Sequence, residues 1–169
     1  MDLESLSFFQ DLPSNLKVFF MSMIPVLELR ASIPWALAHY KDLSHMEIMF
    51  WACSGNICPN FFILWALPKI TKFTRNHWEF ADRKLAKLFE KTRSEHSKKF
   101  NTFGALAIVL FVGTPIPGSG SWTGSLVAWL FGVKYWKAIM LISTGVIIAG
   151  VAVFSLSVGI AKIWHVFHF

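Results

Sequence analysis

The chain has 169 residues, of which 54% are hydrophobic, 16% are aromatic and only 15% are charged. A soluble domain carries about 25% charged residues, so this composition excludes an ordinary soluble fold and favours a single membrane domain over residues 1–169. The formal net charge is +6, and residues 69–99 supply all of it, with ten Lys/Arg against four Asp/Glu. The positive-inside rule places such a segment in the cytoplasm, and we prefer this interpretation to nucleic-acid binding.

The first elements are a short amphipathic segment and a broken apolar stretch. Residues 1–16 carry Leu and Phe at three-residue spacing, which predicts a short helix at the membrane interface. Residues 18–40 form an apolar stretch whose only charges are Glu28 and Arg30. Prolines bracket these two charges, and Pro34 comes two residues after Ser32, as in a new helix that starts with a small polar cap and an early proline. We therefore expect a re-entrant helical hairpin here, with a plain kinked helix as the alternative.

The next two elements are a membrane span and a basic linker. Residues 48–68 contain no charge and match the roughly 20 residues that a helix needs to cross a bilayer. Pro59 within this span is a tolerable kink. Residues 69–99 alternate apolar and basic positions at helical spacing, which predicts an amphipathic helix on the inner leaflet or against the helix bundle.

The second half of the chain repeats this plan. Residues 101–112 and 121–131 predict two half-helices, each too short to cross. The intervening residues 113–120 contain two prolines and three glycines, which no helix tolerates. A second re-entrant hairpin is expected, followed by a charge-free span over residues 138–161.

The predicted fold is an all-α integral membrane protein built from two inverted repeats, residues 18–68 and 101–161. Each repeat is a re-entrant helical hairpin plus a transmembrane helix, and the basic amphipathic helix of residues 69–99 joins them. Inverted repeats with broken helices are typical of secondary transporters. The residues expected to shape the turns are Pro25, Pro34, Pro59, Pro115, Pro117, Gly118, Gly120 and Gly124.

Glu28 and Arg30 are the strongest candidates for a functional site. A charge at membrane depth is costly, so it is usually paired, faces a cavity and has a function. Residues two apart face each other on an extended strand but not on a helix, so a direct Glu28–Arg30 pair predicts unwound backbone. The alternative to an ion or substrate site is a structural salt bridge that holds the hairpin.

The second turn offers a different chemistry, made of hydroxyls, an indole and the amide groups of a helix N-terminus near Ser121. Such a group favours phosphate or carboxylate, and the alternative is that its small residues allow close packing. No P-loop lysine, nucleophile elbow or metal-ligand set is present, so we predict no enzyme activity, no cofactor and no metal. The predicted substrate or ion-binding residues are Glu28, Arg30, Asn56, Thr114, Ser119, Ser121, Trp122 and Thr123.

Several motifs resemble the small multidrug export family. They are Pro25-x-x-Glu-Leu-Arg-x-Ser-Ile-Pro34, Gly55-Asn-x-x-Pro59 and Thr114-Pro-Ile-Pro-Gly-Ser-Gly-Ser-Trp-Thr-Gly124. The resemblance implies a prokaryotic plasma-membrane protein with several spans and an export role. The chain is also distantly similar to the DedA group, which implies paired re-entrant hairpins and phosphorylated polyprenyl lipids as substrates. That group has arginines in its second hairpin, whereas this chain has none there.

The predicted function is therefore a small membrane exporter, proton-coupled through Glu28, with a midplane site between the two hairpin tips. The alternatives are a translocase for an anionic polyprenyl-phosphate lipid and a non-transporting membrane scaffold. The expected partners are membrane lipids and a small-molecule or lipid-phosphate substrate. We also expect a homodimer, because four short elements enclose a pathway poorly.

Overall fold

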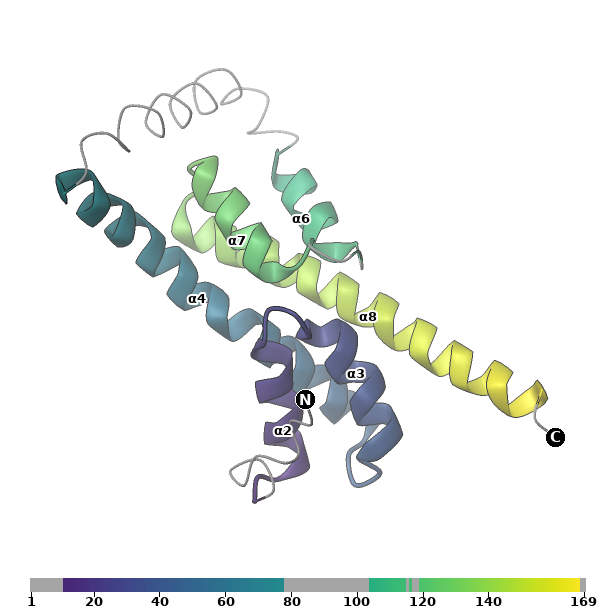
Figure 1. Cartoon of the computed structure of the whole chain (residues 1–169). Coiled ribbons are helices and arrows are strands. Elements are labelled where there is room, and N and C mark those ends of the chain that lie inside the picture. Colours follow the sequence, from purple (N-terminus) through teal and green to yellow (C-terminus); the bar gives the residue numbers. More distant parts are fainter. Residues whose placement is uncertain (1–10, 78–103, 115, 117–118, 168–169) are drawn as a thin grey trace. The chain divides into compact units, whose positions relative to one another are not determined.

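The computed structural model describes residues 11–77, 104–114, 116 and 119–167 (Figure 1). Within these ranges all regular structure is helical and no strand is present, which confirms the all-α prediction. The predicted interfacial helix falls largely on residues outside these ranges. The helices are α2 (Ser14–Met23), α3 (Glu28–His39), α4 (His45–His77), α6 (Ala105–Gly113), α7 (Ser121–Leu130) and α8 (Tyr135–Phe167).

The two long helices, α4 and α8, have the length and composition to cross a membrane. Each has 33 residues, and their apolar parts are His45–Phe73 and Tyr135–Ile160. They include both spans predicted from the sequence. However, α4 continues through Pro68 to His77, so residues 69–77 extend this helix, while the rest of the predicted linker lies outside the described residues.

Both long helices expose many large apolar side chains, which would be unfavourable in water. Contiguous exposed apolar surface marks contact with a membrane or another protein, and its distribution along two helices of this length favours a bilayer. These side chains are Met46, Phe50, Phe61, Phe62, Trp65, Ile70 and Phe73 on α4, and Trp136, Met140, Ile147, Ile148, Val151, Leu156 and Ile160 on α8.

The chain divides into two compact units, and each contains one pair of short helices. The first unit comprises Met1–Cys58 and Ile147–Phe169, and the second comprises Pro59–Val146. The boundary falls within α4 and within α8, so these units differ from the two repeats expected from the sequence. The first unit contains the α2–α3 pair and the second contains the α6–α7 pair.

The α2–α3 pair reverses direction in the short turn of residues 24–27 (Figure 1). The backbone N–H of Glu28 donates to the carbonyl of Ile24 at 2.8 Å, and the two helices pack together. At 10 and 12 residues each helix is too short to cross a bilayer.

The prediction that a new helix starts at Pro34 is wrong, because α3 begins at Glu28 and contains Pro34. The chain has already reversed before Glu28, next to Pro25. Proline lacks an N–H, so inside α3 it removes the one helical hydrogen bond that would reach the carbonyl of Arg30. Membrane helices tolerate such a loss.

The α6–α7 pair lies where the sequence predicts two half-helices. The break between Gly113 and Ser121 is confirmed, and the two helices pack together. The carboxyl end of α7 closes in a Schellman motif, in which the N–H of Val133 reaches the carbonyl of Ala128 at 2.9 Å. Gly132 supplies the left-handed residue of this motif, with φ of 68°.

Glycines allow close helix packing in each unit. In the first unit, a methyl group at Gly55 on α4 would collide with the backbone carbonyl of Phe19 on α2. In the second unit, Val112 on α6 fills the space beside Gly124 on α7 and Gly145 on α8. Small residues that let backbones approach are the usual means of joining helices in a membrane.

Candidate functional site

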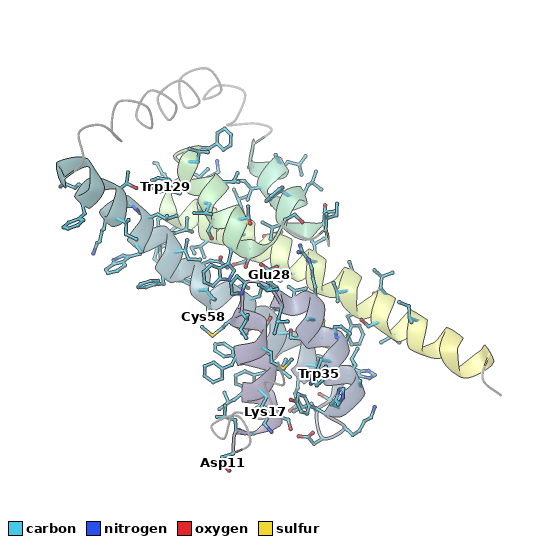
Figure 2. The ribbon with its side chains drawn as sticks, in the orientation of Figure 1. Asp11, Lys17, Glu28, Trp35, Cys58 and Trp129 are labelled. Atoms are coloured by element: carbon cyan, nitrogen blue, oxygen red, sulfur yellow. The ribbon has the colours of Figure 1, made fainter. Side chains whose placement is uncertain are left out.

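Glu28 occupies an unusual position at the turn between α2 and α3 (Figure 2). It is the first residue of α3, and only 5% of its surface is exposed. Its φ of 46° makes it the one non-glycine residue with positive φ in the described part of the chain. A left-handed conformation costs a residue with a Cβ roughly 1–2 kcal/mol. A buried carboxylate and a strained backbone therefore coincide at one residue.

This carboxylate forms an ion pair with Arg30. The Nη1 atom of Arg30 lies 3.8 Å from Oε2 of Glu28, with side-chain exposures of 20% and 7%. The expectation that this pair needs extended backbone is wrong, because both residues belong to α3. The pair can form because Glu28 is at the helix end and departs from helical φ there. At 3.8 Å the contact is longer than a charge-assisted hydrogen bond of about 2.7–2.9 Å.

Glu28 belongs to the buried face of α3. The buried residues of this helix recur in steps of one and three, as expected for one face of an amphipathic helix. Ser32 lies on this face one turn from Glu28, yet the sequence suggested only a capping role for it. The four-residue spacing from Glu28 is the signal that would have marked it. The face comprises Glu28, Leu29, Ser32, Ile33 and Ala36.

Asn56 lies on α4 in the same unit as Glu28, with 1% of its surface exposed. One turn earlier on α4, the carbonyl of Ala52 accepts a hydrogen bond of 2.7 Å from the Ser22 hydroxyl of α2. The interior of the first unit therefore contains several polar groups in addition to the charged pair.

In the second tip, the turn between α6 and α7, the hydroxyls of two residues donate hydrogen bonds to nearby backbone carbonyls. The Thr114 hydroxyl donates to the carbonyl of Leu110 at 2.6 Å. The Oγ atom of Ser119 lies 2.8 Å from the carbonyls of both Thr114 and Ile116. Each of these carbonyls also accepts a backbone N–H, so the hydroxyls add second hydrogen bonds at this turn. This arrangement favours the packing interpretation of both hydroxyls.

The amino end of α7 follows this turn. Gly120 is its N-cap, in extended conformation and without a side-chain cap. Ser121 is buried, whereas Trp122 and Thr123 are half-buried, and the indole Nε1 of Trp122 has no hydrogen-bond partner within the described ranges. The first backbone N–H groups of a helix have no partner within it, so this end can donate to an acceptor.

Not all of the residues expected to shape turns do so. Pro25 lies in the first turn, whereas Pro59 lies inside α4 and Gly124 inside α7. Gly124 permits close packing instead, because Val112 occupies the space beside it. The other predicted turn residues of the second tip, Pro115, Pro117 and Gly118, lie outside the described residues.

A buried polar pair in the second unit was not predicted from the sequence. The Ser125 hydroxyl of α7 donates to Oδ1 of Asn60 on α4 at 2.8 Å, and both residues are fully buried. The two are 65 positions apart, so no local pattern links them. The only sign in the sequence was that Asn60 is a polar residue within an apolar span.

The predicted site residues thus fall into two groups. Glu28, Arg30 and Asn56 belong to the first unit, and the residues from Thr114 to Thr123 belong to the second. Across the described residues, no three His, Cys, Asp or Glu side chains are grouped as a metal site requires. The first group can bind a cation or exchange a proton, whereas the second contains only neutral hydrogen-bonding groups.

A comparison with protein families finds one match to this chain. The model of the family described as "Putative small multi-drug export protein" matches residues 28–152, roughly three quarters of the chain. The match begins at Glu28 and includes all of α4 and the first part of α8. No curated protein and no solved structure matches the chain.

Proposed function

Because this chain belongs to the small multi-drug export protein family, we propose that it is a membrane transporter in which Glu28 exchanges a proton for a small-molecule substrate. One observation carries this proposal: Glu28 is buried and has a left-handed backbone conformation. Both features oppose folding, and residues that retain such costs are concentrated at functional sites.

The contact with Arg30 provides a resting state for this carboxylate. At 3.8 Å the guanidinium offsets the negative charge without a short hydrogen bond. A proton or a cationic substrate can take its place, since either one neutralises the same carboxylate. Arg30 retains 20% side-chain exposure, so its charge can remain solvated when the pair separates. Competition of this kind would couple proton binding to substrate release.

The orientation that we propose follows the charge of the chain. Residues 69–99 carry the basic excess, so the carboxyl end of α4 faces the cytoplasm of a prokaryotic cell. Lys69 lies 3.5 Å from the centre of the Trp65 ring. A tryptophan with a cation over it is typical of the membrane interface. This contact supports placing the membrane boundary near residue 69.

Transport by purified protein in liposomes tests the proposal. We expect an imposed proton gradient to drive efflux of an organic cation, and Glu28→Gln to abolish that flux while the protein still folds. Asp42→Asn is the matched control, because Asp42 is an exposed acid outside the helix pairs and its loss leaves flux unchanged. Equal flux in wild type and Glu28→Gln would remove Glu28 from the mechanism. Absence of any flux would favour a lipid translocase or a scaffold.

A further inference from the structure

Ser32 is a buried hydroxyl that the proposed mechanism does not yet use. Its surface is 0% exposed, and its Oγ atom has no hydrogen-bond partner among the residues that the structure describes. Burying a hydroxyl without a partner destabilises a protein, so such a group needs an explanation.

The other hydroxyls of this protein show what Ser32 could have done. In a helix, a hydroxyl can bond to the carbonyl four residues earlier, and for Ser32 that acceptor is the carbonyl of Glu28. Other buried serines instead reach a neighbouring helix or turn. Ser32 does neither. Hydroxyls that bond four residues back are those of Thr71, Thr114, Thr144 and Ser157, and the serines that bond elsewhere are Ser22, Ser119 and Ser125.

The position of Ser32 relates it to Glu28. The two residues are one helical turn apart on α3 and both belong to its buried face, together with Ala36. Arg30 lies outside this face and is half-buried. The buried face therefore presents the Glu28 carboxylate, which pairs with Arg30, and on the next turn the Ser32 hydroxyl, which has no hydrogen-bond partner among the described residues.

We propose that Ser32 is a ligand-binding residue of the Glu28 site, and that the ligand is an organic cation with N–H groups, a primary or secondary ammonium. This inference rests on the proposed function, since it requires that Glu28 bind substrate. A buried carboxylate selects a cation. An ammonium can donate one N–H to Glu28 in place of the Arg30 contact and a second to Oγ of Ser32, and so gives the Ser32 hydroxyl a partner. A quaternary ammonium has the charge but no N–H, and it leaves Ser32 without a partner.

Two ligands that differ only at nitrogen test this inference: benzylammonium and benzyltrimethylammonium. Their affinities are measured at neutral pH by isothermal titration, with the full chain in lipid nanodiscs. We expect wild type to prefer benzylammonium by more than tenfold, because the quaternary cation can donate to neither Glu28 nor Ser32. Ser32→Ala lowers this preference roughly tenfold, the effect of one hydrogen bond to a charged group, and leaves the part that comes from Glu28. It does not lower the melting temperature, because the lost hydroxyl had no partner.

Ser22→Ala is the matched control. Ser22 is equally buried, but its hydroxyl bonds to the carbonyl of Ala52. This variant lowers the melting temperature and keeps the preference for benzylammonium. A general loss of packing in the first unit would affect both variants alike, so the two measurements separate a ligand contact from a structural role.

Two results would overturn the inference. If Ser32→Ala keeps the full preference, Ser32 takes no part in the selection. If wild type binds both cations equally, the hydroxyl does not contact the ligand. Neither result affects the proposed function, which depends on the flux of Glu28→Gln. Conversely, full flux in Glu28→Gln would contradict the proposed function, whatever the binding preference.

Discussion

The α2–α3 pair and the α6–α7 pair have similar helix lengths, yet they reverse the chain in different ways. The first uses a short turn that ends in a buried, left-handed glutamate. The second uses a segment rich in glycine and proline, in which Ser119 and Thr114 bond to backbone carbonyls. The second tip thus bonds Thr114 and Ser119 to its own backbone and leaves one neutral donor, the Trp122 indole, without a partner among the described residues. The first tip places a charge and an unpartnered hydroxyl on its buried face.

This difference indicates how function is distributed between the pairs. A turn selected only for stability would contain no buried charge and would bond its hydroxyls to the backbone, as Thr114 and Ser119 are bonded in the second tip. Natural proteins depart from such local consistency mainly at functional sites. The first tip departs from it twice, at Glu28 and at Ser32, and is therefore the better candidate for substrate contact.

The largest loss of stability is expected from glycine substitutions where each pair of short helices packs on a long helix. Gly55→Ala would place a methyl group against the Phe19 carbonyl, and backbone cannot move aside easily. Gly145→Ala would meet the Val112 side chain, with Cβ at 2.7 Å. Overpacking costs about 1–3 kcal/mol, so we expect Gly55→Ala near the upper limit and Gly145→Ala below it. Unfolding in detergent micelles measures both.

Gly159→Ala is the control for this pair, since a methyl group there meets no atom within 4 Å. Alanine is the better helix former by about 1 kcal/mol, so this variant should be slightly more stable than wild type. Equal stability of the Gly55 and Gly159 variants would mean that α2 does not pack closely on α4.

A second comparison concerns two residues with positive φ, Glu28 at the start of α3 and Gly132 after the end of α7. Glu28→Gly and Glu28→Ala both remove the carboxylate and differ only in their tolerance of positive φ. We expect the glycine variant to be more stable by about 1 kcal/mol, the reverse of the usual helix preference. Gly132→Ala, at φ of 68°, should lose about the same amount. Denaturant unfolding checks both signs, and an alanine variant at 28 as stable as the glycine variant would show that Glu28 is not strained.

Sequence reasoning located the second pair better than the first. Two prolines and three glycines between residues 113 and 120 leave little choice about where α6 ends and α7 begins. At the first pair, no residue type announces that Glu28 adopts positive φ, because glutamate has no preference for it. The sequence pattern therefore predicts a helix start at Pro34, although Pro34 lies inside α3.

The candidate site was predictable only in part. Glu28 and Arg30 stand out as charges within an apolar stretch, and their position at a turn followed from the flanking prolines. Serine is a common helix-capping residue, so the sequence suggests only that role for Ser32. Its lack of a hydrogen-bond partner becomes visible only in the three-dimensional structure. The Asn60–Ser125 bond joins positions 65 apart. Tertiary partners of that kind are set by helix packing, which a single sequence does not record.

The smallest change in stability is expected from a substitution in the turn between α6 and α7. Ser119→Ala removes the hydroxyl that lies 2.8 Å from two backbone carbonyls, and we expect it to cost about 1 kcal/mol. Ser32→Ala in the first pair should cost nothing, because no bond is lost there. Flux per folded molecule should be unchanged in Ser119→Ala, since its hydroxyl is used within the turn. Reduced flux at equal folded amounts would instead give Ser119 a role in substrate binding. Transport would then depend on residues of both turns.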